Sequence, residues 1–387
     1  MELIADTRAL ADLVRGLRER PFFALDTEFL RETTYWPKLC LIQVAAEGIE
    51  ALIDPLSPTL DLSPLFEALA DPNVMKVFHA ARQDIEIFVR LMGNPPTPIF
   101  DSQIAAMACG HGDSIAYDAL VASVLKRKVD KSSRFSDWSR RPLSPEQLGY
   151  ALADVTHLRD MYPLLQEELE TRNRTDWVAE ELGILTAPET YDVTPDNAWM
   201  RFKPRKTTAA YLAALKAVAG WREQTAQARD MPRGRILKDE AIYEIADQRP
   251  RSIDALTRLR GIPKGWAQSR MGHDLATAMD EALKDPEANA PKFERPAPSK
   301  PGVGPIVELL KVLLKQTADD QDVAARLIAT VSDLEAIASD DPNSPVLKGW
   351  RREVFGDRAL ALKQGRLALV VKGKRLVAMD IAALSVD

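Results

Sequence analysis

Two carboxylates stand two residues apart at the end of an apolar stretch, FFALDTEFL, at residues 22–30. Its composition is that of a β-strand, where side chains alternate between faces, so Asp26 and Glu28 share one face. Carboxylates this close repel each other unless a cation lies between them or one is protonated. Hard divalent ions such as Mg²⁺ take oxygen ligands. The pair is therefore either a metal site or a solvated strand end.

Three further residues of suitable type lie on two predicted helices. Asp84 falls in the first turn of a helix that follows a strand, where the helix dipole favours negative charge. Tyr150 and Asp154 are four residues apart, which places them on one helix face. Alone, each signal is explained by a dipole partner or a surface hydrogen bond. Together they supply the carboxylates that a pair of divalent ions needs to hydrolyse a phosphodiester.

The elements that would position these residues are strands mixed with helices. Strands are predicted at 22–28, 39–46, 48–55 and 74–80, a helix at 82–93, a strand and helix within 99–110, and a helix at 114–125. This order indicates an α/β domain with a partly antiparallel sheet. A long helix begins at Ser144-Pro145-Glu146, with Ser144 as N-cap, and Pro163 is expected to kink or break it.

The second half of the chain is predicted to be helical. Residues 201–284 contain 17 Lys and Arg against 10 Asp and Glu, so this segment is locally positive. Five prolines in 285–304 indicate a semi-extended linker. The expected organisation is a first domain at 1–175, a connecting segment at 176–204, a helical domain at 205–284, the linker at 285–304 and a second helical domain at 305–387.

Composition limits the class of protein. The 387 residues are 46% hydrophobic and 28% charged, which is typical of a folded protein with two or three domains. The net charge of −6 gives no global positive field, so phosphate binding must be local. No apolar run approaches roughly 20 residues and no signal peptide is evident, so a cytoplasmic protein without membrane contact is expected. The GxxxxGK[ST] motif of nucleotide triphosphatases is absent.

Three stretches resemble the exonuclease motifs of the DEDD superfamily, in the variant whose third motif is Tyr-x-x-x-Asp. They are LDTEFLRETTYWPKLCLIQVA, KVFHAARQDIEIF and EQLGYALADVTHL. With the flanking FSDWSRRPLS, the first 170 residues or so resemble the bacterial ribonuclease D family. Residues 205–284 resemble the HRDC domain, and 305–387, with LKGWRREVFG, look like a diverged second copy. The resemblance implies a ribonuclease H-like α/β mixed-sheet exonuclease domain followed by two small all-α HRDC-like domains.

The resemblance also implies an activity: 3′-to-5′ hydrolysis of RNA, one nucleotide at a time, with release of 5′-monophosphates. Carried over by motif, Asp26, Glu28 and Asp154 would hold one divalent metal ion, and Asp26 with Asp84 a second. Mg²⁺ is the expected ion, with Mn²⁺ as the alternative. Tyr150 would orient or deprotonate the attacking water. The implied substrates are RNAs with an unpaired 3′ end, such as tRNA precursors, and the implied state is a monomer.

Substrate contacts are predicted around these motifs. Tyr35 or Trp36 can stack on a 3′-terminal base, and the Gln43 amide can read a base edge or a sugar hydroxyl. Core packing explains Trp36 equally well, and His79 is either a substrate contact or a hydrogen-bonded structural residue. The basic loop before the Tyr-Asp helix is predicted to be a phosphate-binding rim, through Lys131, Arg134, Arg140 and Arg141.

Two alternatives stay open. A DNA exonuclease would use the same acids, because nothing in the motifs reads the 2′-hydroxyl. A non-catalytic nucleic-acid-binding protein would use the helical domains and keep the exonuclease fold as a scaffold. Cleavage assays on matched RNA and DNA oligomers distinguish a DNA exonuclease from an RNA exonuclease. Substitution of Asp84 tests whether the protein is non-catalytic.

Overall fold

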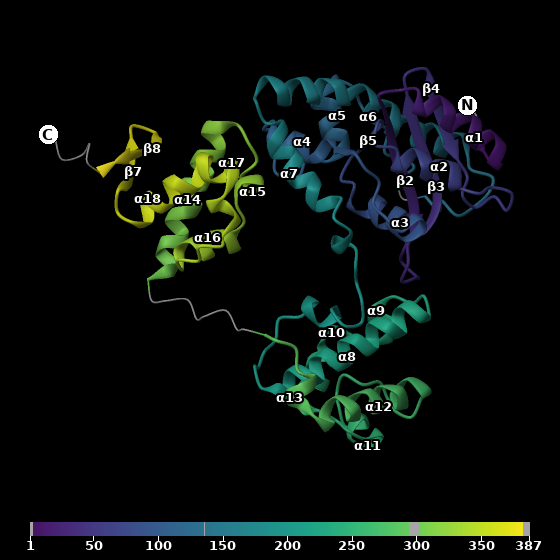
Figure 1. Cartoon of the computed structure of the whole chain (residues 1–387), viewed down its shortest axis with the longest axis vertical. Helices are drawn as coiled ribbons and strands as arrows, with labels where there is room; N and C mark the ends of the chain where they lie inside the picture. The colour runs from purple at the N-terminus through teal and green to yellow at the C-terminus, as the bar shows by residue number, and fades with distance from the viewer. Residues whose placement is uncertain (1–2, 135, 294–301, 382–387) are drawn as a thin grey trace. The chain divides into compact units, whose positions relative to one another are not determined.

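The computed structural model describes residues 3–134, 136–293 and 302–381 (Figure 1). Contacts divide the chain into two compact units that do not follow sequence order. Unit 1 comprises Met1–Thr27, Leu41–Thr190 and Pro298–Asp387, and unit 2 comprises Glu28–Cys40 and Tyr191–Ala297. A short segment directly after Asp26 therefore belongs with the helical unit.

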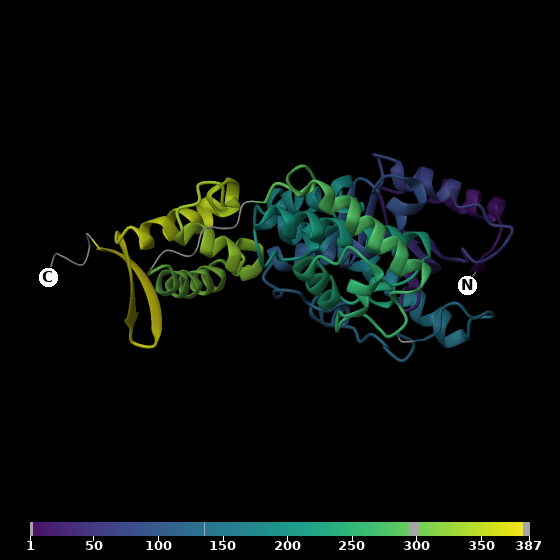
Figure 2. The ribbon, with the colours of Figure 1, turned by 90° about the horizontal axis from the view of Figure 1, so that it is seen from below.

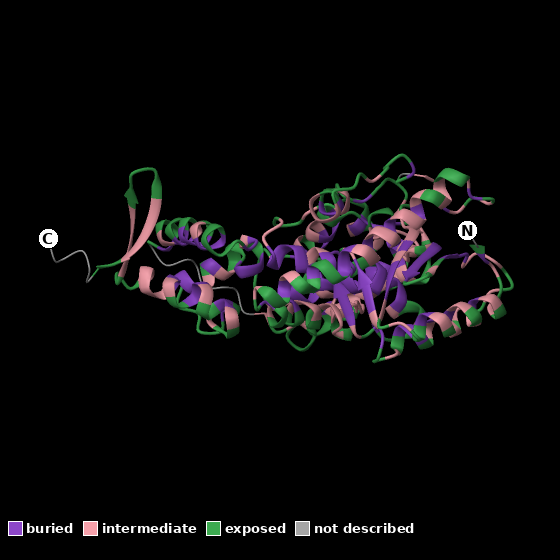
Figure 3. Cartoon of the chain, turned by 90° about the horizontal axis from the view of Figure 1, so that it is seen from above, coloured by how far each residue is buried: buried purple, intermediate pink, exposed green. Residues whose placement is uncertain are grey.

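The main sheet is mixed, as the sequence predicts. Its strands are β1 (Leu3–Ile4), β2 (Phe22–Leu30), β3 (Lys38–Ala46), β4 (Ile49–Ile53), β5 (Met75–Phe78) and β6 (Ile99–Asp101). Their order is β1-β4-β3-β2-β5-β6, with β3 and β4 antiparallel and the β1–β4, β2–β5 and β5–β6 pairs parallel. Most residues of β3, β5 and β6 are buried, whereas β2 is buried at Phe23–Leu25 and Thr27 and intermediate elsewhere (Figure 3).

Helices cover this sheet. They are α1 (Thr7–Arg18), α2 (Ser63–Ala70), α3 (Arg82–Met92), α4 (Ser102–Ala108), α5 (Tyr117–Leu125), α6 (Pro145–Thr171) and α7 (Thr175–Leu185), with a 3₁₀ turn, η1, at Pro188–Thr190. Helix α6 packs against α4, α5, β4 and β5. It starts with a reciprocal cap between Ser144 and Gln147 and continues through Pro163, so the predicted break does not occur. Its contacts with two helices and two strands hold it despite the lost hydrogen bond.

Unit 2 is a helical bundle around one long helix. Its elements are η2 (Ala198–Arg201), α8 (Ala209–Ala228), α9 (Arg233–Ile236), α10 (Asp239–Gln248), α11 (Ile253–Thr257), α12 (Arg270–Lys284) and α13 (Pro286–Asn289). Helix α8 contacts η2, α9, α10, α12 and α13. Trp221 and Leu256 lie in its core, and Tyr243 packs against it.

The C-terminal segment is mostly helical but not all-α. It contains α14 (Val303–Gln321), α15 (Ala325–Ile328), α16 (Val331–Ala338), η3 (Pro345–Leu347), α17 (Gly349–Arg351), a π-helical turn η4 (Arg352–Gly356), α18 (Asp357–Lys363), β7 (Leu367–Lys372) and β8 (Arg375–Asp380). Strands β7 and β8 form an antiparallel hairpin, drawn in yellow in Figure 2. The all-α expectation for this segment is wrong because two apolar runs flank the turn residues Gly373 and Lys374, a pattern typical of a hairpin.

Two further expectations can be placed. Within the predicted linker 285–304, Pro286–Asn289 is helical and α14 begins at Val303, while 294–301 lie outside the described residues. None of the described helices is long and apolar enough to span a membrane.

Candidate active site

Strand β2 carries the first pair of acids. Asp26 and Glu28 occupy alternate positions of one strand and so share a face. Asp26 follows the buried residues Phe23, Ala24 and Leu25, so its carboxylate stands where the core ends. Burial raises the pKa of Asp26 from 3.8 to about 6, partly offset by a hydrogen bond from the Thr27 backbone.

A tight corner between β5 and α3 positions Asp84. Ala80 has a φ of 55° there, and the Asp101 carboxylate accepts hydrogen bonds from the backbone of Ala80 at 3.0 Å and of Ala81 at 2.8 Å. Asp84, in the first turn of α3, is buried and accepts a hydrogen bond from the Thr27 hydroxyl. Burial and the charge of Asp26 raise the pKa of Asp84 well above its ordinary value.

The third acid projects from α6. Asp154 is buried, and burial together with the charge of Asp26 raises its pKa to about 8, although a hydrogen bond from Tyr150 and the charge of Arg134 act in the opposite direction. The Tyr117 hydroxyl donates to the backbone carbonyl of Asp154 and so fixes this turn of the helix. We refer to Asp26, Asp84 and Asp154 as the acidic cluster.

A cavity of about 320 Å³ opens beside the acidic cluster. It is lined by Asp26, His79, Ala80, Gln103, Ala116, Tyr117, Asp118, Val129, Lys131, Arg134, Tyr150, Asp154 and Leu158. Asp84 and Glu28 are not among these lining residues. The cavity therefore brings two of the predicted acids, the predicted tyrosine and two predicted cationic residues together.

The acidic cluster suits a hard divalent ion. Its donors are carboxylate oxygens, which Mg²⁺ and Mn²⁺ prefer. Each carboxylate lies close enough to another for their charges to raise a pKa, so a bound cation would stabilise the ionised forms. Among the residues that the structure describes, no three His, Cys, Asp or Glu side chains converge tightly on one point.

The basic loop divides into residues at the cavity and residues elsewhere. Lys131 lines the cavity and pairs with Asp118 at 2.6 Å, and Arg134 lines it too. Arg140 is exposed and pairs with Asp137, outside the cavity lining. Arg141 donates to both carboxylate oxygens of Asp54 at 2.7 and 2.6 Å, so it anchors the loop to the end of β4.

The other predicted substrate residues are spread over three places. His79 lines the cavity, with Nδ1 2.9 Å from the Ser102 hydroxyl, and burial lowers its pKa, so the ring is neutral near pH 7. Gln43 is fully buried, and its amide makes no hydrogen bond with the described residues. Tyr35 and Trp36 lie in unit 2 and not at the cavity.

Three cavity-related residues were not anticipated from the sequence. Tyr117 meets the cavity beside Asp154, and Gln103, whose amide donates to the Ile115 carbonyl at 3.1 Å, lines it. Asp101 shapes the corner before α3. Of these three residues, only Asp101 could have been identified from the sequence, because an acid between a strand and a helix is typical of an N-cap.

Comparison with known proteins agrees with this arrangement. Residues 1–170 match a family described as 3′-5′ exonuclease, and residues 212–278 match the HRDC domain. Ribonuclease D of Nitrobacter hamburgensis is 49% identical over 381 residues, covering 98% of this chain and 100% of that protein. Ribonuclease D of Gluconacetobacter diazotrophicus is 47% identical, covering 97% and 95%.

Among solved structures, the crystal structure of Escherichia coli RNase D, described as an exoribonuclease involved in structured RNA processing, superposes with a TM-score of 0.81 at 29% identity, covering 94% of this chain and 98% of that one. A 3′-5′ exonuclease domain followed by an HRDC domain is thus the class that fold and site define. Identity at this level over nearly the full length of both chains places the protein in the ribonuclease D family.

Proposed function

We propose that this chain removes nucleotides one at a time from the 3′ end of RNA and releases 5′-monophosphates. The observation that carries the proposal is the acidic cluster: three carboxylates with raised pKa values, two of them buried, beside a cavity that is also lined by Tyr150, Lys131 and Arg134. Groups with perturbed pKa values in a cavity are typical of catalytic sites. Membership of the ribonuclease D family supports the direction and the substrate class.

The metal ligands in this proposal are Asp26, Glu28, Asp84 and Asp154. Two divalent ions, Mg²⁺ or Mn²⁺, would lower the pKa of the attacking water and stabilise charge on the departing oxygen when bound. Without a cation the cluster stays partly protonated near neutral pH, because the pKa of Asp154 is about 8. The Thr27 hydroxyl donates to Asp84, and the Asp101 carboxylate holds the turn that precedes the helix carrying it.

Tyr150 is proposed to orient the attacking water or take its proton. Its phenol lies on the cavity wall and donates to Asp154, one helical turn further on. The ring of Trp138 lies 6.0 Å away between centroids and packs beside it. Tyr117 holds the turn that carries Asp154. The two tyrosines thus fix the orientation of Asp154 from both its side chain and its backbone.

RNA would be held at the cavity by Lys131, Arg134 and His79. Lysine and arginine bind phosphates electrostatically, and such contacts weaken with salt. His79 lines the same cavity, where its ring hydrogen-bonds with the Ile115 backbone and lies 2.9 Å from the Ser102 hydroxyl. The substrates proposed are RNAs with an unpaired 3′ end, tRNA precursors among them. The chain is proposed to act as a monomer in the cytoplasm.

A gel time course on 5′-labelled single-stranded RNA tests the proposal, with Mg²⁺, with chelator, and with the Asp84→Asn variant. The expected result is a ladder that shortens by single nucleotides only with metal and intact Asp84. No shortening by the wild-type protein with Mg²⁺ or Mn²⁺ would contradict it. A matched DNA oligomer separates the DNA exonuclease alternative, and RNA binding without shortening would favour the non-catalytic alternative.

A further inference from the structure

The helical unit contains a cavity of about 560 Å³ that the proposed reaction does not use. All of its lining residues belong to unit 2. Four of the lining side chains are cationic and two are carboxylates, so positive charge is in excess. The segment around it, 201–284, is positive as well, with 17 Lys and Arg against 10 Asp and Glu. The charged residues that line this basic cavity are Arg201, Arg222, Arg233, Lys238, Asp239 and Glu240.

Arg222 forms a fixed, buried part of the wall of the basic cavity. Its exposed fraction is 4%. Its Nη1 donates to the Leu237 carbonyl at 2.8 Å and to the Asp239 carboxylate at 2.6 Å. Its guanidinium also lies over the Phe202 ring, 5.3 Å from the centroid. One of the two carboxylates of the basic cavity is therefore already paired, and the arginine that pairs with it is held in one orientation.

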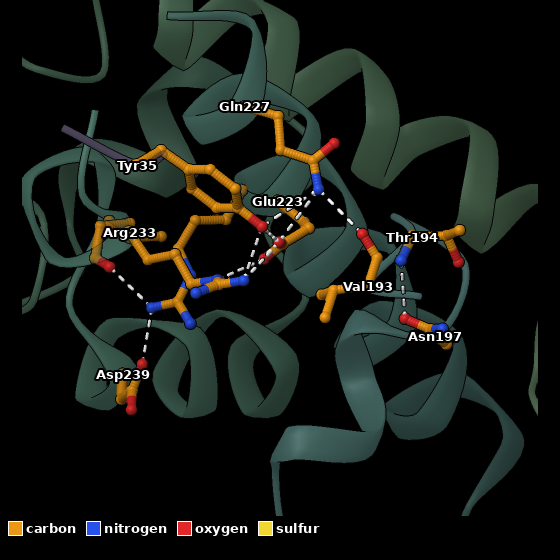
Figure 4. A network of polar contacts seen from close by, with 10 residues as sticks. Tyr35, Val193, Thr194, Asn197, Glu223, Gln227, Arg233 and Asp239 are labelled. Carbon is orange, nitrogen blue, oxygen red and sulfur yellow. Dashed lines mark hydrogen bonds and ion pairs between the residues drawn. The ribbon is translucent and has the colours of Figure 1, made fainter. Parts of the chain in front are cut away.

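Arg233 is held by a buried carboxylate of the same unit (Figure 4). Its Nε and Nη2 donate to Glu223, both at 2.6 Å, and Nη2 also donates to the Tyr35 hydroxyl at 2.7 Å. Burial raises the pKa of Glu223, but the hydrogen bonds from Arg233 and Tyr35 outweigh burial and hold that pKa below its ordinary value, so the carboxylate is ionised. Because both arginines are held before a ligand arrives, binding costs them little conformational entropy.

The other two cations of the basic cavity are exposed. Arg201 ends η2, and Lys238 directly precedes α10. Neither side chain makes a hydrogen bond or an ion pair within the part of the chain that the structure describes. By contrast, Lys206 of the same unit pairs with Asp247. Arg201 and Lys238 are therefore available to an anion.

A phosphodiester suits the charges of the basic cavity. Guanidinium groups donate in a planar fork that matches phosphate oxygens, and lysine adds a point charge. With Arg222 and Arg233 paired to carboxylates, the charges that remain are those of the two exposed cations and of Glu240, which leaves one positive charge. A phosphodiester carries one negative charge, whereas a phosphomonoester carries roughly two near pH 7. The balance favours a phosphate within a nucleic-acid backbone.

We propose that the basic cavity binds one backbone phosphate of RNA. Arg201 and Lys238 contact the phosphate. The two fixed arginines form a positive wall, and Glu240 limits the affinity. The helical unit then holds RNA at a defined place in addition to attracting it through diffuse positive charge. The inference rests on the proposed function, which supplies RNA as the class of ligand.

Fluorescence anisotropy of a 5′-labelled single-stranded RNA measures this binding in the full-length protein, with chelator present so that metal-dependent cleavage does not occur. The double variant Arg201→Ala/Lys238→Ala removes two exposed side chains that the fold does not use. Its affinity should be roughly tenfold lower at low salt. The slope of log affinity against log salt should become shallower by about 0.7, the value for one phosphate of a single strand.

The matched control is the double variant Arg258→Ala/Lys264→Ala. It removes the same charge from exposed positions of the same unit, and neither residue lines the basic cavity. Its affinity should fall by less than about twofold, because salt screens exposed charges that do not contact the ligand. Glu240→Gln changes the basic cavity in the opposite direction, so its affinity for RNA should rise by roughly twofold.

Calorimetric titration with uridine 5′-monophosphate and with inorganic phosphate separates a backbone phosphate from a free one. In chelator, both probes should bind the wild-type protein and Arg201→Ala/Lys238→Ala equally weakly. Binding of either probe that is lost in this double variant would overturn the assignment to a backbone phosphate, because the basic cavity would then be a site for free phosphate groups.

Equal losses of RNA affinity in the double variant and in its matched control would overturn the inference. So would wild-type affinity in both the double variant and Glu240→Gln. RNA shortening by the wild-type protein would leave the proposed function standing under either result. Conversely, a wild-type protein that binds RNA as expected and shortens none with Mg²⁺ or Mn²⁺ would overturn the proposed function and not the assignment of the basic cavity.

Discussion

Two sets of carboxylates, one in each compact unit, have opposite electrostatic surroundings. In the helical unit, Arg233, Gln227 and Tyr35 surround Glu223, and its pKa lies below the ordinary value. In unit 1, the acidic cluster has one hydroxyl for Asp84 and one phenol for Asp154, and all three pKa values are raised.

The difference distinguishes a carboxylate that stabilises the fold from carboxylates that are suited to bind a metal ion. A buried charge is costly unless it is paired, so a satisfied carboxylate such as Glu223 holds structure together. An uncompensated group of carboxylates persists only where something else uses it, and a divalent cation is the partner that carboxylate oxygens fit. The predictions below test this contrast.

The largest expected effect is on catalysis. Asp84→Asn should reduce the rate of RNA shortening by about a thousandfold, because bound metal contributes several kcal/mol to the reaction. The same change should leave the Tm of the metal-free protein unchanged or higher, because it removes one of the repelling charges. Single-turnover kinetics and calorimetry measure the two quantities. A lower Tm together with retained activity would mean that Asp84 stabilises the fold and does not serve catalysis, which contradicts the contrast.

Next is the stability of the helical unit. Glu223→Ala should lower the free energy of unfolding by about 3 kcal/mol, because Tyr35, Gln227 and the half-buried Arg233 would lose their shared acceptor. Denaturant unfolding monitored by tryptophan fluorescence measures this change. Glu281→Ala is the matched control, since its ion pair with Lys284 is exposed and little change is expected. Equal effects of the two substitutions would contradict a structural role for Glu223.

The two groups should also give opposite pH dependence without metal. The folded pKa of Asp154, about 8, lies above its ordinary 3.8, so its contribution to stability is complete below about pH 4 and is lost as the pH rises towards 8. The folded pKa of Glu223 lies below 4.5, so its contribution is present above that value and is lost as the pH falls.

Calorimetry in chelator across pH measures both slopes. Asp154→Asn should remove much of the loss on the alkaline side, Glu223→Gln should weaken the loss on the acid side, and Mn²⁺ should restore stability most near pH 8. A Tm that stays level in chelator between pH 5 and pH 8 would be evidence against the raised pKa values.

The smallest effect concerns the basic loop. Arg134→Ala should raise KM for RNA by roughly tenfold at low salt and less at high salt, because Arg134 lines the cavity where phosphate would bind. Arg140→Ala, outside the cavity lining, should change KM by less than about twofold. Steady-state kinetics at two salt concentrations measures both KM values. Equal increases in KM for the two variants would indicate that Arg140 also binds phosphate.

The strand and the two helices that carry the predicted acids could be predicted from sequence, because local rules decide them. Strand alternation puts Asp26 with Glu28, and helical spacing puts Tyr150 with Asp154. The mixed sheet follows similarly from short apolar runs and turns. The burial of Tyr35 in the helical unit could not be predicted, because its hydrogen-bond partner Glu223 lies 188 residues away in the sequence. The sequence also suggested that Arg141 binds phosphate. Its actual partner, Asp54, is 87 residues away and could not be identified from local sequence patterns.

The most direct test of the contrast between the two groups is a crystal structure of the wild-type protein soaked with Mn²⁺, with anomalous scattering to locate the ions. We expect one or two peaks within coordination distance of Asp26, Asp84 and Asp154, with the Glu28 carboxylate turned towards them, and no peak at Glu223. Peaks only elsewhere, in a protein that shortens RNA in the same Mn²⁺ concentration, would contradict the assignment of the acidic cluster as the metal site.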